Sequence, residues 1–217
     1  MPNLNSNSIS SASKQSHTDI QADKKKLRAK IRKQRRSLSL SQQRKASANL
    51  CRRLKRSKLL LKHQHIALYL GNDGELNPQL LIKQLWEQKK HVYLPVVHPL
   101  YHNRLCFCLV TPNSKFSKNK FGILEPDFKY STLFPRKSLS LVLMPLVAFD
   151  NAGNRMGMGG GFYDRSFAYK AESKHSRPKL IGLAHAFQEQ ECLPVEKWDI
   201  PLDGVLTDLK FHQFKVA

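Results

Sequence analysis

Five short segments of this 217-residue chain are apolar along almost their whole length, and they restrict the folds open to it. They are residues 65–70, 91–97, 105–110, 141–148 and 179–186. Strands that are apolar on both faces are typical of a parallel sheet covered on both sides, whereas half-solvated strands alternate apolar with polar residues. With helical segments between the strands, the pattern predicts an α/β fold. We expect a three-layer sandwich whose mostly parallel central sheet is covered by helices on both faces.

Helix signals precede and separate these strands. Apolar residues recur at helical spacing within residues 27–38 and again within residues 46–54, where Ser39 or Ser41 can serve as the N-cap. A third helix is predicted over residues 78–89 because an Asn-Pro pair starts it, and these residues suit the cap and the first helical position.

The loops differ in composition from the strands, and two of them follow strand ends. In a largely parallel sheet, ligands gather at the carboxyl ends of the strands, so the loop after residues 68–70 and the loop after residues 141–149 both qualify as binding sites. Residues 111–122 are polar and lysine-rich, which favours a mobile segment that can act as a lid.

The length suits one domain, and we expect it to span residues 23–217 after a disordered tail of residues 1–22. The four cysteines lack the spacing of zinc ligands, which fits reduced thiols in the cytoplasm. No apolar run is long enough for a membrane span, and the start of the chain has no secretory signal. Asp19 and Asp23 argue against a transit peptide, so a soluble cytoplasmic protein is expected.

The net charge of +21 is distributed unevenly. Residues 24–62 contain 17 Lys or Arg and no Asp or Glu, whereas residues 141–217 contain nine of each sign. Such a basic segment attracts any polyanion at low salt. A solvated basic helical surface explains it at least as well as a dedicated nucleic-acid site, so we expect no specific nucleic-acid partner.

Glycines cluster directly after the apolar run of residues 141–149. Gly157, Gly159, Gly160 and Gly161 lack a Cβ, so their backbone can turn several N–H groups toward one anion, and a helix is predicted to begin at the following Phe-Tyr-Asp. The cluster fits neither the dinucleotide fingerprint nor the Walker A loop. A tight strand-to-helix turn is the alternative, but four glycines in five residues exceed what a turn needs. We therefore favour phosphate binding.

Five ordered motifs within residues 24–206 resemble the 5-formyltetrahydrofolate cyclo-ligase family, also called 5,10-methenyltetrahydrofolate synthetase, in its bacterial form. They are Lys24-x-x-Leu27-Arg28; Leu70-Gly-Asn-Asp-Gly-Glu75-Leu; Phe121-Gly-Ile-Leu-Glu125-Pro126; Pro145-Leu-Val-Ala-Phe-Asp150 with Gly153-Asn-Arg-Met-Gly-Met-Gly-Gly-Gly-Phe-Tyr-Asp164; and Leu193-Pro-Val-Glu-x-Trp-Asp199-Ile-Pro. The resemblance implies an ATP- and Mg2+-dependent enzyme that converts 5-formyltetrahydrofolate to 5,10-methenyltetrahydrofolate through a phosphorylated formyl group and releases ADP and phosphate.

The resemblance also implies a role for particular residues. It assigns ATP binding to Lys24, Arg28, Arg155, Met156, Gly157, Met158, Gly159, Gly160, Gly161, Phe162 and Tyr163, with Arg155 and Tyr163 also catalytic. It assigns folate binding to Leu70, Glu75, Phe121, Met158 and Phe162, and magnesium to Asp164 and Asp199. Some relatives carry lysine or arginine where this chain has Met158 and Gly160. The chain's other cations are therefore expected to carry more of the phosphate charge.

Each of these residues also has a simpler interpretation. Lys24 and Arg28 lie four apart and can be ordinary solvated cations. Glu75 can be a loop charge, and Asp199 can be a turn residue, with Asp203 as the second metal carboxylate. His185 lies in an apolar strand and is expected to be a hydrogen-bonded core histidine, so it is given no role.

Two other functions compete with the ligase. A nucleic-acid-binding module would rest on the basic segment but lacks a recognised motif. A kinase for another small molecule would keep the glycine loop and the metal and change the acceptor. We expect a monomeric enzyme whose substrates are ATP and 5-formyltetrahydrofolate and which has no membrane partner.

Overall fold

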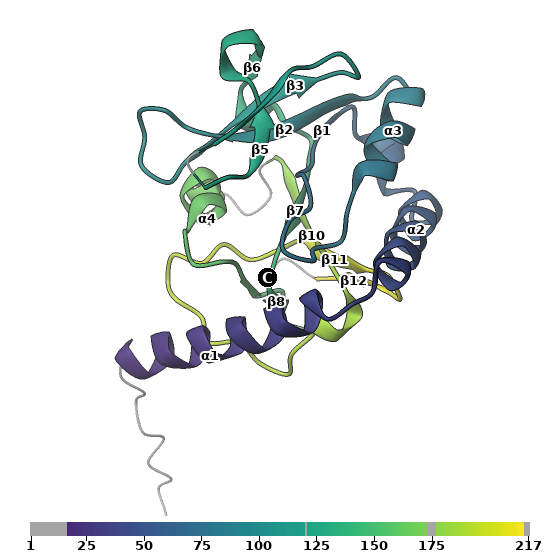
Figure 1. The fold of residues 1–217 in the computed structure, drawn as a ribbon. Helices are drawn as coiled ribbons and strands as arrows, with labels where there is room; N and C mark the ends of the chain where they lie inside the picture. The colour runs from purple at the N-terminus through teal and green to yellow at the C-terminus, as the bar shows by residue number, and fades with distance from the viewer. Residues whose placement is uncertain (1–16, 120, 173–176, 215–217) are drawn as a thin grey trace, which may run out of the picture.

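The computed structural model describes residues 17–119, 121–172 and 177–214, and it has the predicted α/β fold (Figure 1). Its central sheet has eight strands in the order β12-β11-β10-β7-β1-β2-β3-β6. Their bounds are β1 His65–Ala67, β2 His91–Val97, β3 Leu105–Val110, β6 Leu133–Phe134, β7 Leu141–Pro145, β10 Lys179–Ala184, β11 Gly204–Thr207 and β12 Phe211–Gln213. The five central strands β11, β10, β7, β1 and β2 pair in parallel, as expected for strands that are buried on both faces.

Both edges of the sheet are antiparallel, which differs from a strict alternation of strands and helices. No helix separates β2 from β3, and the two strands form a hairpin in which Val92 pairs with Val110. The short strand β6 extends this edge, and β12 closes the other edge against β11. The predicted strand over residues 141–148 divides into β7 and a two-residue strand β8, Ala148–Phe149, which pairs with β9, Arg155–Met156.

Helices cover both faces of the sheet, as predicted (Figure 1). On one face, α2 (Leu40–Arg56) and α3 (Gln79–Glu87) pack on side chains such as Leu68, Leu94 and Leu143. On the other face, α4 (Phe162–Phe167) and the 3-10 helix η4 (Ala168–Ala171) pack on side chains that include Phe107 and Met144. Alternate residues of a strand point to opposite faces, so fully apolar strands supply both cores.

The helix starts follow their capping residues. Ser39, and not Ser41, caps α2, and it forms a capping box with Gln42. Before α3, the Asn77 side chain accepts from the Gln79 backbone N–H at 2.9 Å, but Pro78 occupies the N-cap position. The predicted cap at Asn77 was therefore one residue too early, and the helix spans Gln79–Glu87 instead of residues 78–89. The remaining 3-10 helices are η1 Leu59–Lys62, η2 Phe128–Tyr130, η3 Arg136–Ser138 and η5 Ala186–Gln188.

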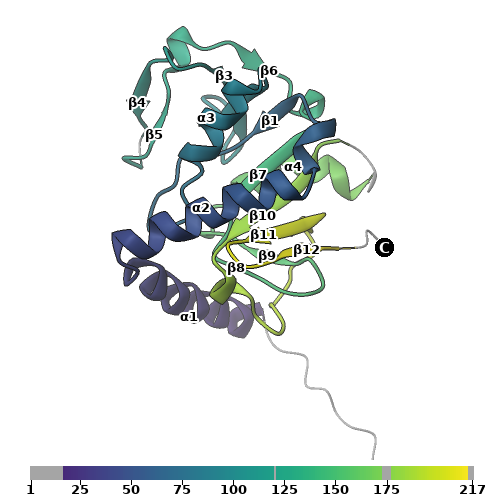
Figure 2. The same ribbon diagram turned by 90° about the vertical axis from the view of Figure 1, so that its right-hand side faces the viewer.

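Helix α1 spans His17–Arg36 and runs across the end of the sheet, beside the β8–β9 hairpin (Figures 1 and 2). It begins at His17, so residues 17–22 of the predicted tail are helical, while residues 1–16 lie outside the described residues. Ile31 and Leu27 on α1 pack with Val147, Met156 and Leu193. This contact carries the basic N-terminal segment to the carboxyl ends of the parallel strands.

The segment predicted as a lid contains a strand. Residues 116–118 form β4 (Phe116–Lys118), which pairs with β5 (Leu124–Pro126) in a small hairpin above the sheet edge (Figure 2). The mobility of this segment stays a prediction. In the described part of the chain, no helix is both long and apolar enough to cross a membrane.

Candidate functional site

A pocket of about 840 Å³ lies at the carboxyl ends of β1, β2 and β7. Every residue to which the sequence assigned a role lines it: Lys24, Arg28, Leu70, Glu75, Phe121, Arg155, Met156, Gly157, Met158, Gly159, Gly160, Gly161, Phe162, Tyr163, Asp164 and Asp199. These residues come from α1, β9, α4 and four loops, which are distant in the sequence. The pocket therefore reaches Lys24 and Asp164 together, as the phosphate-site hypothesis requires.

The glycine loop follows the short hairpin of β8 and β9. The Asp150 carboxylate fixes the turn of this hairpin by accepting from the backbone N–H groups of Ala152, Asn154 and Leu193 at 3.0 to 3.1 Å. Gly159 has a φ of 99° and Gly161, the N-cap of α4, has a φ of 64°. These left-handed angles favour glycine over residues with a Cβ.

Side chains from outside the loop hold its carbonyl oxygens. Arg28 donates to the Gly157 oxygen at 2.9 Å, while Asn103 and Arg165 donate to the Gly160 oxygen at 2.9 and 2.7 Å. Among the described residues, the backbone N–H groups of residues 157–161 have no hydrogen-bond partner. Occupied carbonyl groups and free N–H groups are the arrangement that binds an anion.

Two carboxylates in the pocket are each paired with a cation. Asp164 Oδ1 accepts from Arg155 Nη2 at 2.7 Å and from the Ile200 backbone N–H at 3.1 Å. Asp199 Oδ2 accepts from Lys24 Nζ at 3.1 Å and from the Glu196 backbone N–H at 2.9 Å. The contact of the Ile200 backbone with Asp164 therefore brings the segment that carries Asp199 next to Asp164.

Asp203 is not part of this arrangement. Its Oδ2 atom accepts from the Leu180 backbone N–H at 2.7 Å and lies 3.9 Å from Lys170 Nζ, outside the residues that line the pocket. The structure therefore favours Asp199 over Asp203 as the second carboxylate. His185 also lies outside the pocket lining, is 3 % exposed, and its Nε2 atom is 3.2 Å from the Gly74 oxygen, as expected for a core histidine.

Glu75 projects from the loop after β1 into the opposite side of the pocket. Burial raises the pKa of Glu75 to about 7, although the Asn72 N–H, 3.1 Å from Oε2, and Arg35 lower it. Tyr69 and Tyr163 also face this carboxylate, and burial raises the pKa of both phenols. The group therefore titrates near neutral pH between two protonated phenols.

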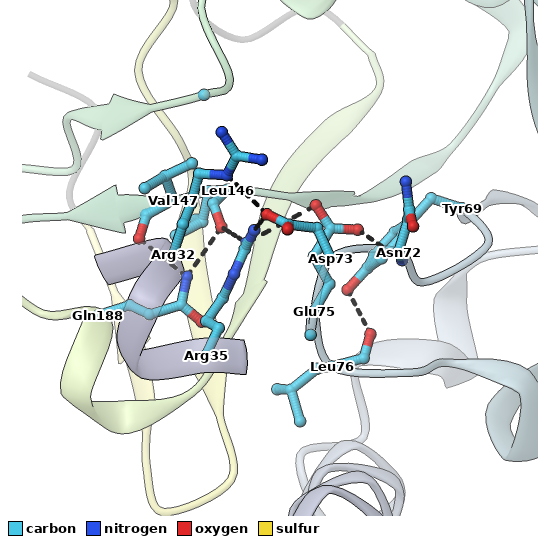
Figure 3. A network of polar contacts seen from close by, with 12 residues as sticks. Arg32, Arg35, Tyr69, Asn72, Asp73, Glu75, Leu76, Leu146, Val147 and Gln188 are labelled. Carbon is cyan, nitrogen blue, oxygen red and sulfur yellow. Dashed lines mark hydrogen bonds and ion pairs between the residues drawn. The ribbon is translucent and has the colours of Figure 1, made fainter. Parts of the chain in front are cut away.

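A cluster of arginines on α1 holds the turn that carries Glu75 (Figure 3). Asp73 accepts from Arg32 at 2.7 Å and from Arg35 at 2.6 Å, and it also pairs with Arg36. Burial raises the pKa of Asp73, but the three arginines outweigh burial and lower it to about 2. This cluster was not predicted from the sequence, because a run of arginines on a helix does not show which of them point inward.

The aromatic side of the pocket is formed by Phe121 and Phe162. Their rings pack edge to face with 5.9 Å between the ring centroids, and Phe121 is 54 % exposed. Leu70 and Met158 complete an apolar wall suited to a flat heteroaromatic ligand. Trp198 and residues 123–126 of the β4–β5 hairpin also line the pocket and were not predicted as site residues, whereas Phe121 in the turn of this hairpin was.

Comparison with known proteins decides the family. A family model described as the 5-formyltetrahydrofolate cyclo-ligase family matches residues 20–208. This chain belongs to the 5-formyltetrahydrofolate cyclo-ligase family. It therefore has the activity of that family, an ATP-dependent ligase of folate metabolism, and the resemblance drawn from the sequence motifs is confirmed.

Individual relatives cover nearly the whole chain. The 5-formyltetrahydrofolate cyclo-ligase of Escherichia coli (strain K12) is 41% identical over 184 residues, which are 85% of this chain and 100% of the relative. The 5-formyltetrahydrofolate cyclo-ligase of Haemophilus influenzae is 40% identical over 183 residues, which are 84% of this chain and 96% of the relative. The NMR structure of Aquifex aeolicus 5,10-methenyltetrahydrofolate synthetase has a TM-score of 0.75 at 30% identity and covers 88% of this chain and 93% of its own.

Proposed function

We propose that the pocket binds ATP at the glycine loop and 5-formyltetrahydrofolate beside Glu75, and that it produces 5,10-methenyltetrahydrofolate, ADP and phosphate. The observation that carries this proposal is the convergence of Lys24, Arg28 and Arg155 on a loop with free backbone N–H groups. A triphosphate needs both the cations and the N–H donors. The aromatic wall opposite suits a pterin.

In the proposed reaction, the formyl oxygen of the substrate attacks the γ-phosphorus of ATP, and ADP leaves. N10 then bonds to the formyl carbon, the phosphorylated oxygen departs as phosphate, and N10 loses its proton. Because the substrate supplies both nucleophiles, the protein needs no nucleophilic side chain. Its contribution is positioning and electrostatic stabilisation.

Arg155 and Tyr163 are the proposed catalytic residues. Arg155 is 8 % exposed and held by Asp164, so its charge is fixed where phosphate charge develops. Burial keeps the Tyr163 phenol protonated, which allows it to donate a hydrogen bond to a substrate oxygen. Lys24 and Arg28 would neutralise the remaining phosphate oxygens.

Asp164 and Asp199 fit a magnesium ion, which takes one or two protein carboxylates and completes its shell with water and phosphate oxygens. In the described part of the chain, no cluster of three or more His, Cys, Asp or Glu offers a protein cage for a metal. When bound, Mg2+ would neutralise charge on the transferring phosphate. Before the ion binds, Lys24 would remain paired with Asp199 and Arg155 with Asp164.

All the proposed binding residues come from one chain, so we propose that a monomer is active. The test of the function is an absorbance assay for the methenyl product with Mg-ATP and 5-formyltetrahydrofolate, together with ADP release. We expect both products in equal amounts. ADP release from other acceptors, without the methenyl product, would instead favour a small-molecule kinase.

The ATP site is tested by a matched pair on α1. Lys24→Met should raise KM for ATP by about ten- to hundredfold, because it removes a charge-assisted hydrogen bond from a buried site. Lys25→Met changes an exposed neighbour and should leave KM unchanged. Equal effects of the two substitutions would contradict a specific role for Lys24.

A further inference from the structure

Arg35 is an arginine of α1 whose side chain is completely buried. Its Nη2 atom donates to Asp73 at 2.6 Å, and its Nη1 atom donates to the Leu146 oxygen at 3.3 Å and lies 3.7 Å from Glu75 Oε1 (Figure 3). A buried guanidinium costs several kcal/mol in lost hydration unless its partners compensate. Its three acceptors are Asp73, the Leu146 oxygen and Glu75.

Two of its three partners are already satisfied by other groups. The Leu146 oxygen accepts from Gln188 Nε2 at 2.8 Å. Asp73 is paired with both Arg32 and Arg36. Neither contact by itself requires a third arginine.

Glu75 differs from these partners. Within the described residues, Arg35 is the one cation within 4 Å of its carboxylate. In the described part of the chain, the carboxylate also accepts from the Asn72 N–H on Oε2, which leaves Oε1 to Arg35. The planar fork of an arginine can join several acceptors in fixed geometry, and here it links α1, the end of β7 and the turn after β1.

We propose that Arg35 is a positioning residue for 5-formyltetrahydrofolate: it holds the turn of residues 72–75 against the end of β7 and orients the Glu75 carboxylate toward the folate. This inference rests on the proposed folate role of Glu75. Arg35 does not line the pocket, so it acts through Glu75 and not by touching the substrate.

The test is a double-mutant cycle of Arg35→Lys and Glu75→Gln, read as equilibrium binding of 5-formyltetrahydrofolate without ATP. Lysine keeps the charge and loses the fork. Each single variant should weaken folate binding by about tenfold, the loss expected for one charged hydrogen bond, and leave ATP binding unchanged. The double variant should bind no more weakly than Glu75→Gln alone. Arg36→Gln is the matched control, because Arg36 also pairs with Asp73 but is exposed, and it should bind folate normally.

The outcomes distinguish an error in the folate role of Glu75 from an error in the inference for Arg35. If Glu75→Gln binds folate normally, both the folate role of Glu75 and the inference for Arg35 are wrong. If Glu75→Gln binds folate weakly and Arg35→Lys weakens folate binding by a further tenfold in the double variant, only the inference for Arg35 is wrong. If Arg35→Lys does not fold, Asp73→Asn replaces it in the cycle, because it loosens the turn from all three arginines and should give the same non-additive loss, while Arg32→Gln and Arg36→Gln, which leave Arg35 in place, should not.

Discussion

Asp164 is the residue whose contacts join the two halves of the pocket. It accepts from Arg155 on β9 and from the backbone of residue 200, so it links the glycine loop to the segment that carries Asp199. In the proposed function, this position lets one carboxylate orient an arginine and help hold a magnesium ion.

Asp164→Asn should lower kcat by at least about tenfold and raise the magnesium concentration needed for half-maximal activity, because an amide is a poorer magnesium ligand and a weaker partner for Arg155. Magnesium titration of the purified variant measures both quantities. Glu191→Gln, a change of an exposed carboxylate outside the pocket lining, should alter neither. An unchanged magnesium requirement in Asp164→Asn would remove this residue from the proposed metal site.

Glu75 makes stability depend on pH. Its pKa is about 7 in the folded protein and near 4.5 in the unfolded chain, so between these values the folded state holds a proton that the unfolded state has released. The free energy of unfolding therefore falls as pH rises through this window. The shift corresponds to on the order of 3 kcal/mol. Glu75→Gln should lack this loss.

Denaturant unfolding of both proteins at pH 4.5, 6 and 8 measures the effect. The variant should gain stability relative to the natural protein as pH rises from 4.5 to 7 and keep a constant difference above that. Asp73 titrates near 2 and does not contribute in this range. Parallel stability curves across all three pH values would show that Glu75 has an ordinary pKa.

At the scale of elements, α1 presents five inward positions at helical spacing, Lys24, Leu27, Arg28, Ile31 and Arg35. Three of the five are cations, and they contact the pocket and its supporting loop, while the two apolar residues pack on the core. The exposed face carries lysines such as Lys25 and Lys33. The basic residues of this helix therefore form two surfaces, one that contacts the pocket and its supporting loop and one that is exposed to solvent.

The turn from the glycine loop into α4 depends on backbone conformation. Gly161→Ala would place a Cβ 2.5 Å from Arg165 Nη1 at a φ of 64°, whereas a Cβ at Gly157 meets nothing within 4 Å. We expect Gly161→Ala to lose about 1–2 kcal/mol of stability and Gly157→Ala to lose less. Thermal unfolding of both variants measures this difference. Equal losses would mean that the left-handed conformation at Gly161 is not strained by a side chain.

At the scale of the whole molecule, the positive net charge lies mainly on α1 and α2, whereas residues 141–217 carry equal numbers of basic and acidic residues. The protein should bind duplex DNA of any sequence at 50 mM salt and lose that binding by 200 mM, because counterion release drives it. Lys55→Glu, on an exposed position of α2, should weaken this binding and leave ligase activity unchanged. Sequence-specific binding that survives 200 mM salt would contradict this expectation.

The sequence by itself determined the parallel centre of the sheet, the glycine loop and the family. Apolar strands and left-handed glycines are local features, and their pattern does not depend on distant partners. The ends of β2 and β3 were predicted correctly for the same reason. The short strands β4, β5, β6, β9, β11 and β12, each of which has an antiparallel partner, were not predicted, because segments of two to four residues carry too little pattern.

Only the tertiary structure decided which charges are buried in the pocket or beneath the loop that carries Glu75. Along α1, Lys24 and Lys25 are identical in chemistry, and Arg35 and Arg36 are as well, yet one of each pair is buried. The choice between Asp199 and Asp203 was equally open in the sequence. Burial of a charge is affordable where partners from other segments compensate its lost hydration, and those partners, Asp73 and Leu146 for Arg35, are brought together only when the chain folds.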